Sequence, residues 1–558
     1  MTRTRWRLAE NGPELTHESG QPTMGLLNAN PFAEGIANLG AQVIAAAVLD
    51  EGWNVEFGFA DTCSPASPFL ANLVAPDRCP VLAFSIPFED TYHHVPRMLR
   101  ACGVATLARD RAESEPVVIA GGLALINPMP LAPFFDAVVI GEGREAIVAV
   151  NATVLDARAR GLGRPAILER LAGIPHVFVP ALYEFAFAPD GTVTEFNATG
   201  GAPGEIDPGR PLDMTQHPIT SLWTTERACY KYPDYYSVMV AMGCHLKCPF
   251  CVVGNVQGME SGRAANITRD MILELSLQRR QDYGTNLIKL FFASSFSAQS
   301  AIDPLSIKNL LAEMLQHHFQ CRVGSLNVRQ ADDELLGMVR RAGQDRVTFA
   351  PETVESLRQS IGKPYSKDDK LIYIAERAGG HDLGLDLYTM LGVPGEEPRH
   401  VRELARLIRE VRRALPPHLS LEVSINPAFA KAQTPYERHP TLRPEETRRR
   451  FAYLRRHLGD ETGIAWVSVI SDPMTYYQPI LSMGGPELAP VLMELSGSFA
   501  PTEHQWRDAI NRMVPGGDER YFQERPWPAR LPWQHIRYND HRKLSLRLDA
   551  HRLRASNA

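Results

Sequence analysis

The sequence lacks the features of a membrane, secreted or nucleic-acid-binding protein. No apolar run among its 558 residues reaches the roughly 20 residues that span a bilayer. The polar, Arg-rich start of the chain has no apolar core of the kind that secretion signals carry. A net charge of -6 over this length gives no general attraction for polyanions. We therefore expect a cytoplasmic protein without a membrane partner, for which nucleic acid is an unlikely ligand.

Cysteine is also scarce, with eight residues in the whole chain. Those outside one short loop are scattered singly, which is not the pattern of a disulfide framework, and reduced thiols fit a cytoplasmic chain. They are Cys63, Cys79, Cys102, Cys229 and Cys321. The remaining composition is globular, with 44% hydrophobic and 22% charged residues, and the length exceeds a single core. Two or three domains are expected.

The other three cysteines, Cys244, Cys248 and Cys251, share one loop with C-x3-C-x2-C spacing, directly after a strand-like run at 237–241. Three thiolates on one loop can hold three irons of a [4Fe–4S] cluster and leave the fourth iron open to a small molecule. Two alternatives are three buried cysteines, or a zinc site completed by His245. A zinc site of this kind usually takes its last ligands from a second, distant pair, and the sequence shows none.

This loop resembles the signature of the radical S-adenosylmethionine (SAM) superfamily, in which an aromatic residue, here Phe250, precedes the last cysteine. The resemblance implies that the open iron binds the amino and carboxylate groups of SAM. It also implies an external electron donor of the flavodoxin or ferredoxin type. Whether a carboxylate such as Glu260 or Glu274 closes the fourth iron position is left open.

The N-terminal part alternates strand-like and helical segments, which predicts a parallel, doubly wound, Rossmann-like sheet. The predicted strands are 24–30, 55–60, 79–85, 116–120 and 137–141, with helices at 36–51 and 92–102. Sheets of this class bind ligands beyond the carboxyl ends of their strands. The residues at those ends include Asn28, Asn30, Ser85, Gly121, Gly122, Gly141 and Gly143.

This sheet is similar to the cobalamin-binding domains that precede the barrel in one class of radical SAM enzymes. The resemblance implies cofactor contacts at Ser85 and at the pair Gly121-Gly122, where glycine allows a bulky ligand to approach the backbone. We add Gly141 and Gly143 as strand-end candidates. The Asp-x-His-x-x-Gly motif of these domains is absent, because the chain reads Asn-Pro-Phe-Ala-Glu-Gly from Asn30. In the family this loss is common among methyltransferases.

Two alternatives apply to this domain. It can be a corrinoid-type fold that has lost its ligand and serves as a docking platform, since a fold alone does not decide its ligand. His93 and His94 lie where the third strand turns into its helix, close to the expected corrin. One of them could approach cobalt, but a histidine pair at a helix start is more often simply hydrogen-bonded.

Six further strand-helix units predict a partial (β/α)6 TIM-type barrel, with the cysteine loop after its first strand. The predicted strands are 236–241, 286–292, 321–326, 346–350, 385–392 and 419–425. Reacting groups in such barrels lie at the carboxyl ends of the strands. By resemblance, the SAM contacts there are Ser294, Ser295, Ser325, Arg329, Glu352 and Gly392, with Phe250 from the loop. Ser294 and Ser295 stand where the family often has Gly-Gly-Glu.

The expected organisation has five parts. They are a tail at 1–22, the cobalamin-binding domain at 23–150, a connector at 151–232, the barrel at 233–470 and a C-terminal cap at 471–558. Pro189-Asp190-Gly191 predicts a hairpin within the connector. The cap carries Trp527, Trp533 and Tyr538, which we expect to be packed rather than to form a substrate lid.

These expectations together predict a cobalamin-dependent C-methyltransferase of the radical SAM fold. A methyl group would pass from SAM to cob(I)alamin and then to a carbon of a small molecule or natural-product precursor. One family member with this layout, which also lacks the histidine motif, methylates carbon 2 of tryptophan in thiopeptide biosynthesis, so tryptophan is the most specific candidate. The alternatives are a radical SAM enzyme that modifies RNA or a peptide without cobalamin, and a non-catalytic iron–sulfur protein. The sequence assigns no catalytic side chain.

Overall fold

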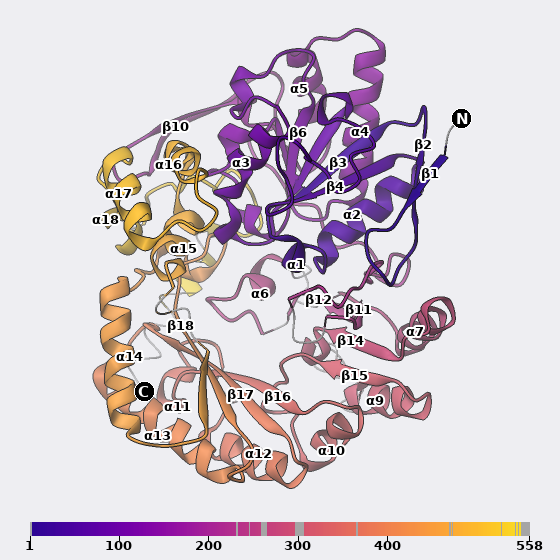
Figure 1. Cartoon of the computed structure of the whole chain (residues 1–558). Coiled ribbons are helices and arrows are strands. Elements are labelled where there is room, and N and C mark those ends of the chain that lie inside the picture. The colour runs from indigo at the N-terminus through magenta and orange to yellow at the C-terminus, as the bar shows by residue number, and fades with distance from the viewer. Residues whose placement is uncertain are drawn as a thin grey trace.

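The computed structural model describes two parallel sheets, one above the other in Figure 1, and the helices that cover them. The described residues are 3–229, 233–244, 246–257, 265–295, 306–363, 366–467, 470, 472–525, 527–541, 543–544, 546–547 and 549. No described helix has both the length and the apolar character of a membrane span.

The N-terminal sheet has six strands in the order β4-β3-β5-β6-β7-β8. They are β3 (Thr23–Asn28), β4 (Asn54–Phe59), β5 (Val81–Ser85), β6 (Val117–Gly121), β7 (Ala137–Val139) and β8 (Val177–Phe178). All adjacent pairs are parallel except β7 and β8. Every residue of β3 and β4 is buried, as expected for strands covered on both faces. The five predicted strands are confirmed, each to within two residues at either end.

Helices cover both faces of this sheet (Figure 1). One face packs against α2 (Leu39–Asp50), α4 (Arg144–Ala159) and α5 (Arg164–Ala172). The other packs against α3 (His94–Ala101) and three helices from the far end of the chain, α15 (Met474–Met483), α16 (Ala489–Leu495) and α17 (Glu503–Met513). The C-terminal cap is therefore part of the hydrophobic core of the N-terminal domain. Two short helices, α1 (Phe32–Gly35) and α18 (Glu519–Phe522), complete these regions.

The barrel consists of two groups of parallel strands. An isolated parallel β-bridge between Leu326 and Phe349 joins the two groups. The first run is β11 (Tyr236–Met239), β14 (Leu287–Phe291) and β15 (Gln320–Val323). The second is β16 (Arg346–Glu352), β17 (Gly384–Leu391), β18 (Leu421–Pro427) and β19 (Ile464–Val467). The predicted partial barrel is confirmed, and β19 adds a strand that was not predicted.

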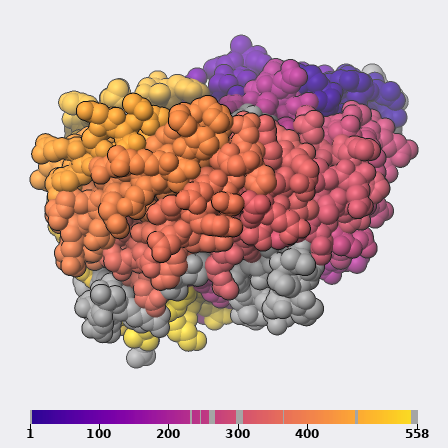
Figure 2. All heavy atoms as spheres, turned by 90° about the horizontal axis from the view of Figure 1, so that it is seen from below, coloured from indigo at the N-terminus to yellow at the C-terminus, as the bar shows by residue number. Residues whose placement is uncertain are grey.

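Helices surround the barrel strands, and pink to orange atoms of this part make up most of the face seen in Figure 2. The helices are α7 (Arg269–Tyr283), α9 (Ser306–Gln316), α10 (Asp333–Arg341), α11 (Glu355–Arg358), α12 (Asp368–Gly380), α13 (Pro398–Ala414) and α14 (Pro444–Leu458). One continuous apolar core fills the space between these helices and the strands.

Two hairpins complete the fold. The predicted one forms between β9 (Tyr183–Phe187) and β10 (Val193–Ala198), with Gly191 at φ 85° and the Thr192 N–H donating to the Asp190 carboxylate at 2.9 Å. The Val193 N–H donates to the Arg530 carbonyl oxygen at 2.8 Å, so this hairpin is tied to the cap. The other, β1 (Arg3–Trp6) with β2 (Leu15–Glu18), occupies the segment expected to be a tail.

Candidate functional site

The cysteine loop begins after β12 (Ala241–Met242), which pairs with β13 (Ala265–Asn266) in a two-stranded ribbon. The loop ends in the short helix α6 (Val252–Val256). Cys248 is buried, whereas Cys244 and Cys251 are half-buried. The Cys251 N–H donates to the Cys248 carbonyl oxygen at 3.0 Å, which closes a turn between the two. The Asn255 side chain donates to the carbonyl oxygens of Cys248 and Cys251 at 2.9 and 2.7 Å. These bonds fold the loop back on itself.

Gly254 permits this tight fold. A Cβ atom at this position would lie 3.0 Å from the Lys247 Cα atom and 3.3 Å from the Cys244 carbonyl oxygen. Any larger residue would therefore push the two ends of the loop apart. No local sequence signal marks Gly254 for this role, because the overlap depends on the path of the folded loop.

The loop thiols affect one another electrostatically. Burial raises the pKa of Cys248 to about 12; the charges of Cys251 and Cys244 also raise it, and the Lys363 ammonium opposes them. Burial likewise raises the pKa of Cys251. A metal ligand must be a thiolate, so positive charge is needed here to stabilise the deprotonated form.

The loop offers three cysteine thiols, which is the donor set of a [4Fe–4S] cluster with one open iron. In the part of the chain that the structure describes, no group of three or more His, Cys, Asp or Glu side chains is arranged to hold a metal ion. A [4Fe–4S] cluster does not need such convergence, because each cysteine binds a different iron. His245, which would complete the zinc alternative, lies outside the described residues.

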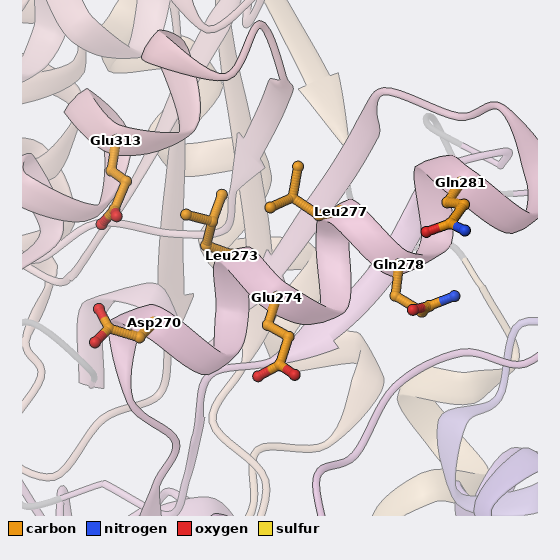
Figure 3. Close-up of a pocket in the computed structure, with 7 residues that line it drawn as sticks. All are labelled: Asp270, Leu273, Glu274, Leu277, Gln278, Gln281 and Glu313. Atoms are coloured by element: carbon orange, nitrogen blue, oxygen red, sulfur yellow. The ribbon is translucent and has the colours of Figure 1, made fainter.

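Of the two carboxylates considered for the fourth iron, the structure describes only Glu274. Glu260 lies outside the described residues. Glu274 is exposed on α7, whereas the buried Ile272, Ser276 and Arg279 form the packed face of this helix. Glu274 lines a hollow of about 320 Å³ together with Asp270, Leu273, Leu277, Gln278, Gln281 and Glu313. Figure 3 shows these seven side chains. Glu274 therefore faces this hollow.

A second segment packs directly on the cysteine loop. Gly362, at φ 75°, approaches so closely that a Cβ atom there would lie 3.3 Å from the Pro249 Cδ atom. The next residue, Lys363, places its ammonium 5.8 Å from the centre of the Phe250 ring and 2.7 Å from the Glu352 carboxylate. The structure thus brings two predicted site residues, Phe250 and Glu352, together through a lysine to which the sequence analysis gave no function.

Glu352 itself ends β16 and is 9% exposed. Its φ of 65° is unusual for a residue with a side chain, and the bond to Lys363 holds the carboxylate in this conformation. Lys363 also donates to the Ala350 carbonyl oxygen at 2.7 Å. The end of β16 and the cysteine loop are therefore one connected unit.

Ser294 and Ser295 follow β14 as predicted. Ser295 is buried, and the Gln330 side chain donates to the Ser294 carbonyl oxygen at 3.5 Å. The Gln330 Oε1 atom is buried and has no hydrogen-bond partner among the described residues; the same holds for Asn426 Oδ1 at the end of β18. Orphaned acceptors at strand ends fit a ligand that supplies donors, such as the ammonium group of SAM.

The other predicted SAM contacts differ in environment. Ser325 and Arg329 follow β15 and are exposed, and the Arg329 N–H donates to the Asn327 side chain at 3.0 Å. Gly392 follows β17 at φ 85°, and a Cβ atom there would lie 2.6 Å from the Leu442 side chain. Packing within the chain therefore accounts for this glycine without a ligand.

On the N-terminal sheet, three strand-end residues lie side by side. Asn28 pairs with Ser85, and Ser85 pairs with Gly121, across β3, β5 and β6. Gly121 has room for a side chain, since a Cβ atom would lie 3.9 Å from Val139. The Asn28 Nδ2 atom is buried without a partner among the described residues. This edge therefore offers a donor and open space to a ligand.

The remaining glycine candidates serve the fold of the chain. A Cβ atom on Gly122, at φ 131°, would lie 2.3 Å from the Ile86 carbonyl oxygen. One on Gly141, at φ 90°, would lie 2.3 Å from the Gly209 carbonyl oxygen. Gly143 directly precedes α4, and a Cβ atom there would lie 3.2 Å from the Ile44 side chain.

The loop after β5 contacts the barrel. Glu89, with a side chain 6% exposed, accepts from the Lys431 ammonium at 2.7 Å and from the Ser482 hydroxyl at 2.9 Å. Lys431 follows β18 and Ser482 belongs to α15, so sheet, barrel and cap meet at this ion pair. Beside it, burial and then the charge of Glu89 raise the pKa of Asp90 to about 6.

His93 and His94 face the cap. Their rings lie 4.0 Å apart, and His93 Nε2 is 3.0 Å from the Phe499 carbonyl oxygen. The His94 ring lies tilted against the Phe499 ring with 4.6 Å between the ring centres, and burial lowers the pKa of His94 to about 3. The pair is packed between the sheet and the cap.

The cap also reaches the cysteine loop. Trp533 is fully buried, and its indole N–H donates to Glu437 at 3.1 Å. Tyr538 packs partly buried against the core, whereas Trp527 is 49% exposed.

Arg547 donates to the Lys247 carbonyl oxygen at 2.9 Å and to the Asn255 side chain at 3.2 Å. A residue near the end of the described chain thus braces the loop that carries the three cysteines.

Comparisons with known proteins place this geometry in a family. Residues 238–408, which include the cysteine loop and four following barrel strands, match the radical SAM superfamily, and residues 73–180 match the family of radical SAM protein N-terminal regions. The chain belongs to the radical SAM superfamily. Residues 238–408 are therefore a radical SAM domain, for which a [4Fe–4S] cluster and SAM are the expected cofactors.

The radical SAM chain has distant relatives. An uncharacterized protein of Methanocaldococcus jannaschii is 24% identical over 231 residues, which are 41% of this chain and 47% of the relative. The chain thus matches about half the length of this curated relative.

Two solved radical SAM structures are also similar to the chain. TsrM from Kitasatospora setae, a methyltransferase with cobalamin and a [4Fe–4S] cluster bound, is 15% identical, with 88% of this chain and 98% of that chain covered and a TM-score of 0.49. OxsB, a cobalamin-dependent radical SAM enzyme with aqua-cobalamin bound, is 11% identical, with 71% and 53% covered and a TM-score of 0.45.

Proposed function

We propose that this radical SAM enzyme binds cobalamin and methylates a carbon atom of a small molecule. The supporting observation is the contact between the loop after β5 and the loop after β18 through Glu89 and Lys431. Both loops follow the carboxyl ends of parallel strands, where doubly wound sheets and barrels bind their ligands. Two loops at which ligands are expected therefore contact each other.

Three groups of residues would hold the cofactors. The cluster ligands are Cys244, Cys248 and Cys251; the SAM contacts are Phe250, Ser294, Ser295, Ser325, Arg329, Glu352 and Gly392; and the corrinoid contacts are Ser85, Gly121, Gly122, Gly141 and Gly143. When bound, the cluster supplies an electron, and SAM and the corrinoid supply the methyl group.

The side chains of this enzyme bind and orient. The carboxylate of Glu352, held by Lys363, is placed to accept hydrogen bonds from ribose hydroxyls. Asn28 and Ser85 offer donors at the sheet edge. The loop from Asn30 to Gly35 contains no histidine, so it offers no imidazole to cobalt. The described cap packs on the sheet and contacts the cysteine loop through Arg547.

Corrinoid retention tests the cobalamin assignment. The chain is reconstituted anaerobically with iron, sulfide and hydroxocobalamin, desalted, and examined for corrinoid absorbance. Gly121→Leu should fold, because the position is open, yet retain much less corrinoid. Gly204→Leu is the control, since Gly204 has nothing within 4 Å of an added Cβ atom and lies in the connector. Equal retention by Gly121→Leu and wild type would remove this binding edge from the proposal.

Turnover tests the methylation. The reconstituted enzyme is supplied with SAM, cobalamin, a reductant of the flavodoxin or ferredoxin type and tryptophan, and the products are analysed by mass spectrometry. Methyltryptophan labelled from methyl-labelled SAM is the expected product. Absence of that product with the corrinoid bound would exclude tryptophan and direct the search to other small molecules. A chain that binds the cluster but no corrinoid would instead favour a radical SAM enzyme that acts without cobalamin.

A further inference from the structure

Lys363 is the cation that lies against the cysteine loop from the barrel side. Its side chain is 12% exposed, and its ammonium group is 5.8 Å from the ring centre of Phe250, between Cys248 and Cys251 in the sequence. Close packing of Gly362 on the loop fixes the start of this side chain, since a Cβ atom on Gly362 would lie 3.5 Å from the Cys248 Cα atom. The ammonium is therefore a fixed charge.

The Glu352 carboxylate, 2.7 Å from Lys363, offsets part of this charge. The lysine is the member of this pair that contacts the loop, because its ammonium lies over the Phe250 ring and its neighbour Gly362 packs on Pro249 and Cys248.

We propose that Lys363 is a tuning residue that raises the reduction potential of the cluster held by Cys244, Cys248 and Cys251. Reduction adds one negative charge to a group that three thiolates already make negative, and a nearby cation lowers the energy of the reduced form. Glu352 acts in the opposite direction, so the two residues set the potential as a pair. The inference rests on the cluster ligands of the proposed function and is independent of cobalamin and of the methyl acceptor.

A redox titration tests the inference. The full chain is reconstituted anaerobically without SAM, and the reduced cluster is quantified by electron paramagnetic resonance at defined potentials. In Lys363→Met, the ratio of reduced to oxidised cluster at the wild-type midpoint should fall about tenfold, which is a shift of about 59 mV to a more negative potential for one electron. Lys363→Arg should keep most of the wild-type ratio.

A matched control is available four residues along the chain. Lys367 also lies 2.7 Å from a glutamate, Glu355, but its side chain is 58% exposed. Lys367→Met should leave the midpoint unchanged. A shift of equal size in this variant would assign the effect to overall charge and overturn the role of Lys363.

The direction of the midpoint shift in a second variant distinguishes tuning from a structural effect. Glu352→Gln should move the midpoint to a more positive potential, because the lysine charge is then no longer offset. An unchanged or more negative midpoint in Glu352→Gln overturns the inference, even where Lys363→Met fails to retain its cluster. Iron and sulfide analysis distinguishes the two proposals. A wild-type chain that holds no four-iron cluster refutes the proposed function. An intact cluster whose midpoint is the same in the wild type and in the variants refutes only the tuning by Lys363.

Discussion

The ion pair between Glu89 and Lys431 should stabilise the docking of the sheet on the barrel. Only 6% and 16% of the two side chains are exposed, and Lys431 also donates to the Ser482 hydroxyl at 2.9 Å. Lys431→Met would leave a buried carboxylate without its counter-charge. Removing one partner of a buried pair costs about 3–5 kcal/mol, so this loss is expected in the free energy of unfolding.

The double variant Glu89→Gln, Lys431→Met should be more stable than Lys431→Met alone, because a neutral amide needs no counter-charge and can still bond to Ser482. Recovery of at least about 2 kcal/mol is expected, since replacing both partners of a buried pair is often nearly neutral. Lys367→Met serves as the exposed control, for which a loss of at most about 1 kcal/mol is expected.

The assay is urea unfolding of each variant at pH 7, followed by tryptophan fluorescence and circular dichroism. Burial acts to raise the pKa of Glu89, but the charge and hydrogen bond of Lys431 outweigh it and hold the pKa below the ordinary value. The stability from this pair is therefore present above the unfolded pKa and is lost as the pH falls through the folded one. The reasoning is refuted if Lys431→Met loses no more free energy of unfolding than Lys367→Met. It is also refuted if the double variant is as unstable as Lys431→Met alone.

Three further predictions concern the fold and the loop. His94→Phe should flatten the pH dependence of the free energy of unfolding. The pKa of His94 is lowered to about 3 in the folded chain, so below about pH 6.5 only the unfolded chain takes up the proton. The wild type therefore loses up to about 1.4 kcal/mol of this free energy for each pH unit below that point. Gly122→Ala should cost more than about 2 kcal/mol in urea unfolding, because the residue has φ 131° and a Cβ atom overlaps the Ile86 carbonyl oxygen, whereas Gly121→Ala should cost less. Arg547→Gln should speed the loss of the cluster to a chelator, seen as faster bleaching of the visible absorbance, since two hydrogen bonds that brace the loop are weakened; bleaching at the wild-type rate would contradict this.

The strands and the cysteine loop could be predicted because their signals are local. A strand buried on both faces is a continuous apolar run, as in Val81–Ser85, and the spacing of Cys244, Cys248 and Cys251 lies within eight consecutive residues. Alternation of such runs with helical segments then indicated the parallel sheets. The predicted ends of the strands lie close to the observed ones, because a strand ends where its apolar run ends.

The support of the site could not be predicted, because it comes from segments far apart in the sequence. Arg547 contacts the Lys247 carbonyl oxygen across 300 residues, and no local pattern marks an arginine for this role. The same reason applies to Lys363, whose place beside Phe250 depends on how β16 packs against the cysteine loop. Gly122 is a proposed ligand contact, and only the folded chain shows that the Ile86 carbonyl oxygen also requires a glycine there.

The cap has a consequence for how the chain reaches its native state. His93 contacts the carbonyl oxygen of Phe499, 406 residues later, and the α3 side of the sheet is buried by the helices around it. At roughly 5–20 residues per second, a ribosome needs about 20–80 seconds to synthesise the intervening residues. During that time one apolar side of an otherwise complete sheet is uncovered, so the nascent chain is a natural client for chaperones that shield hydrophobic surfaces.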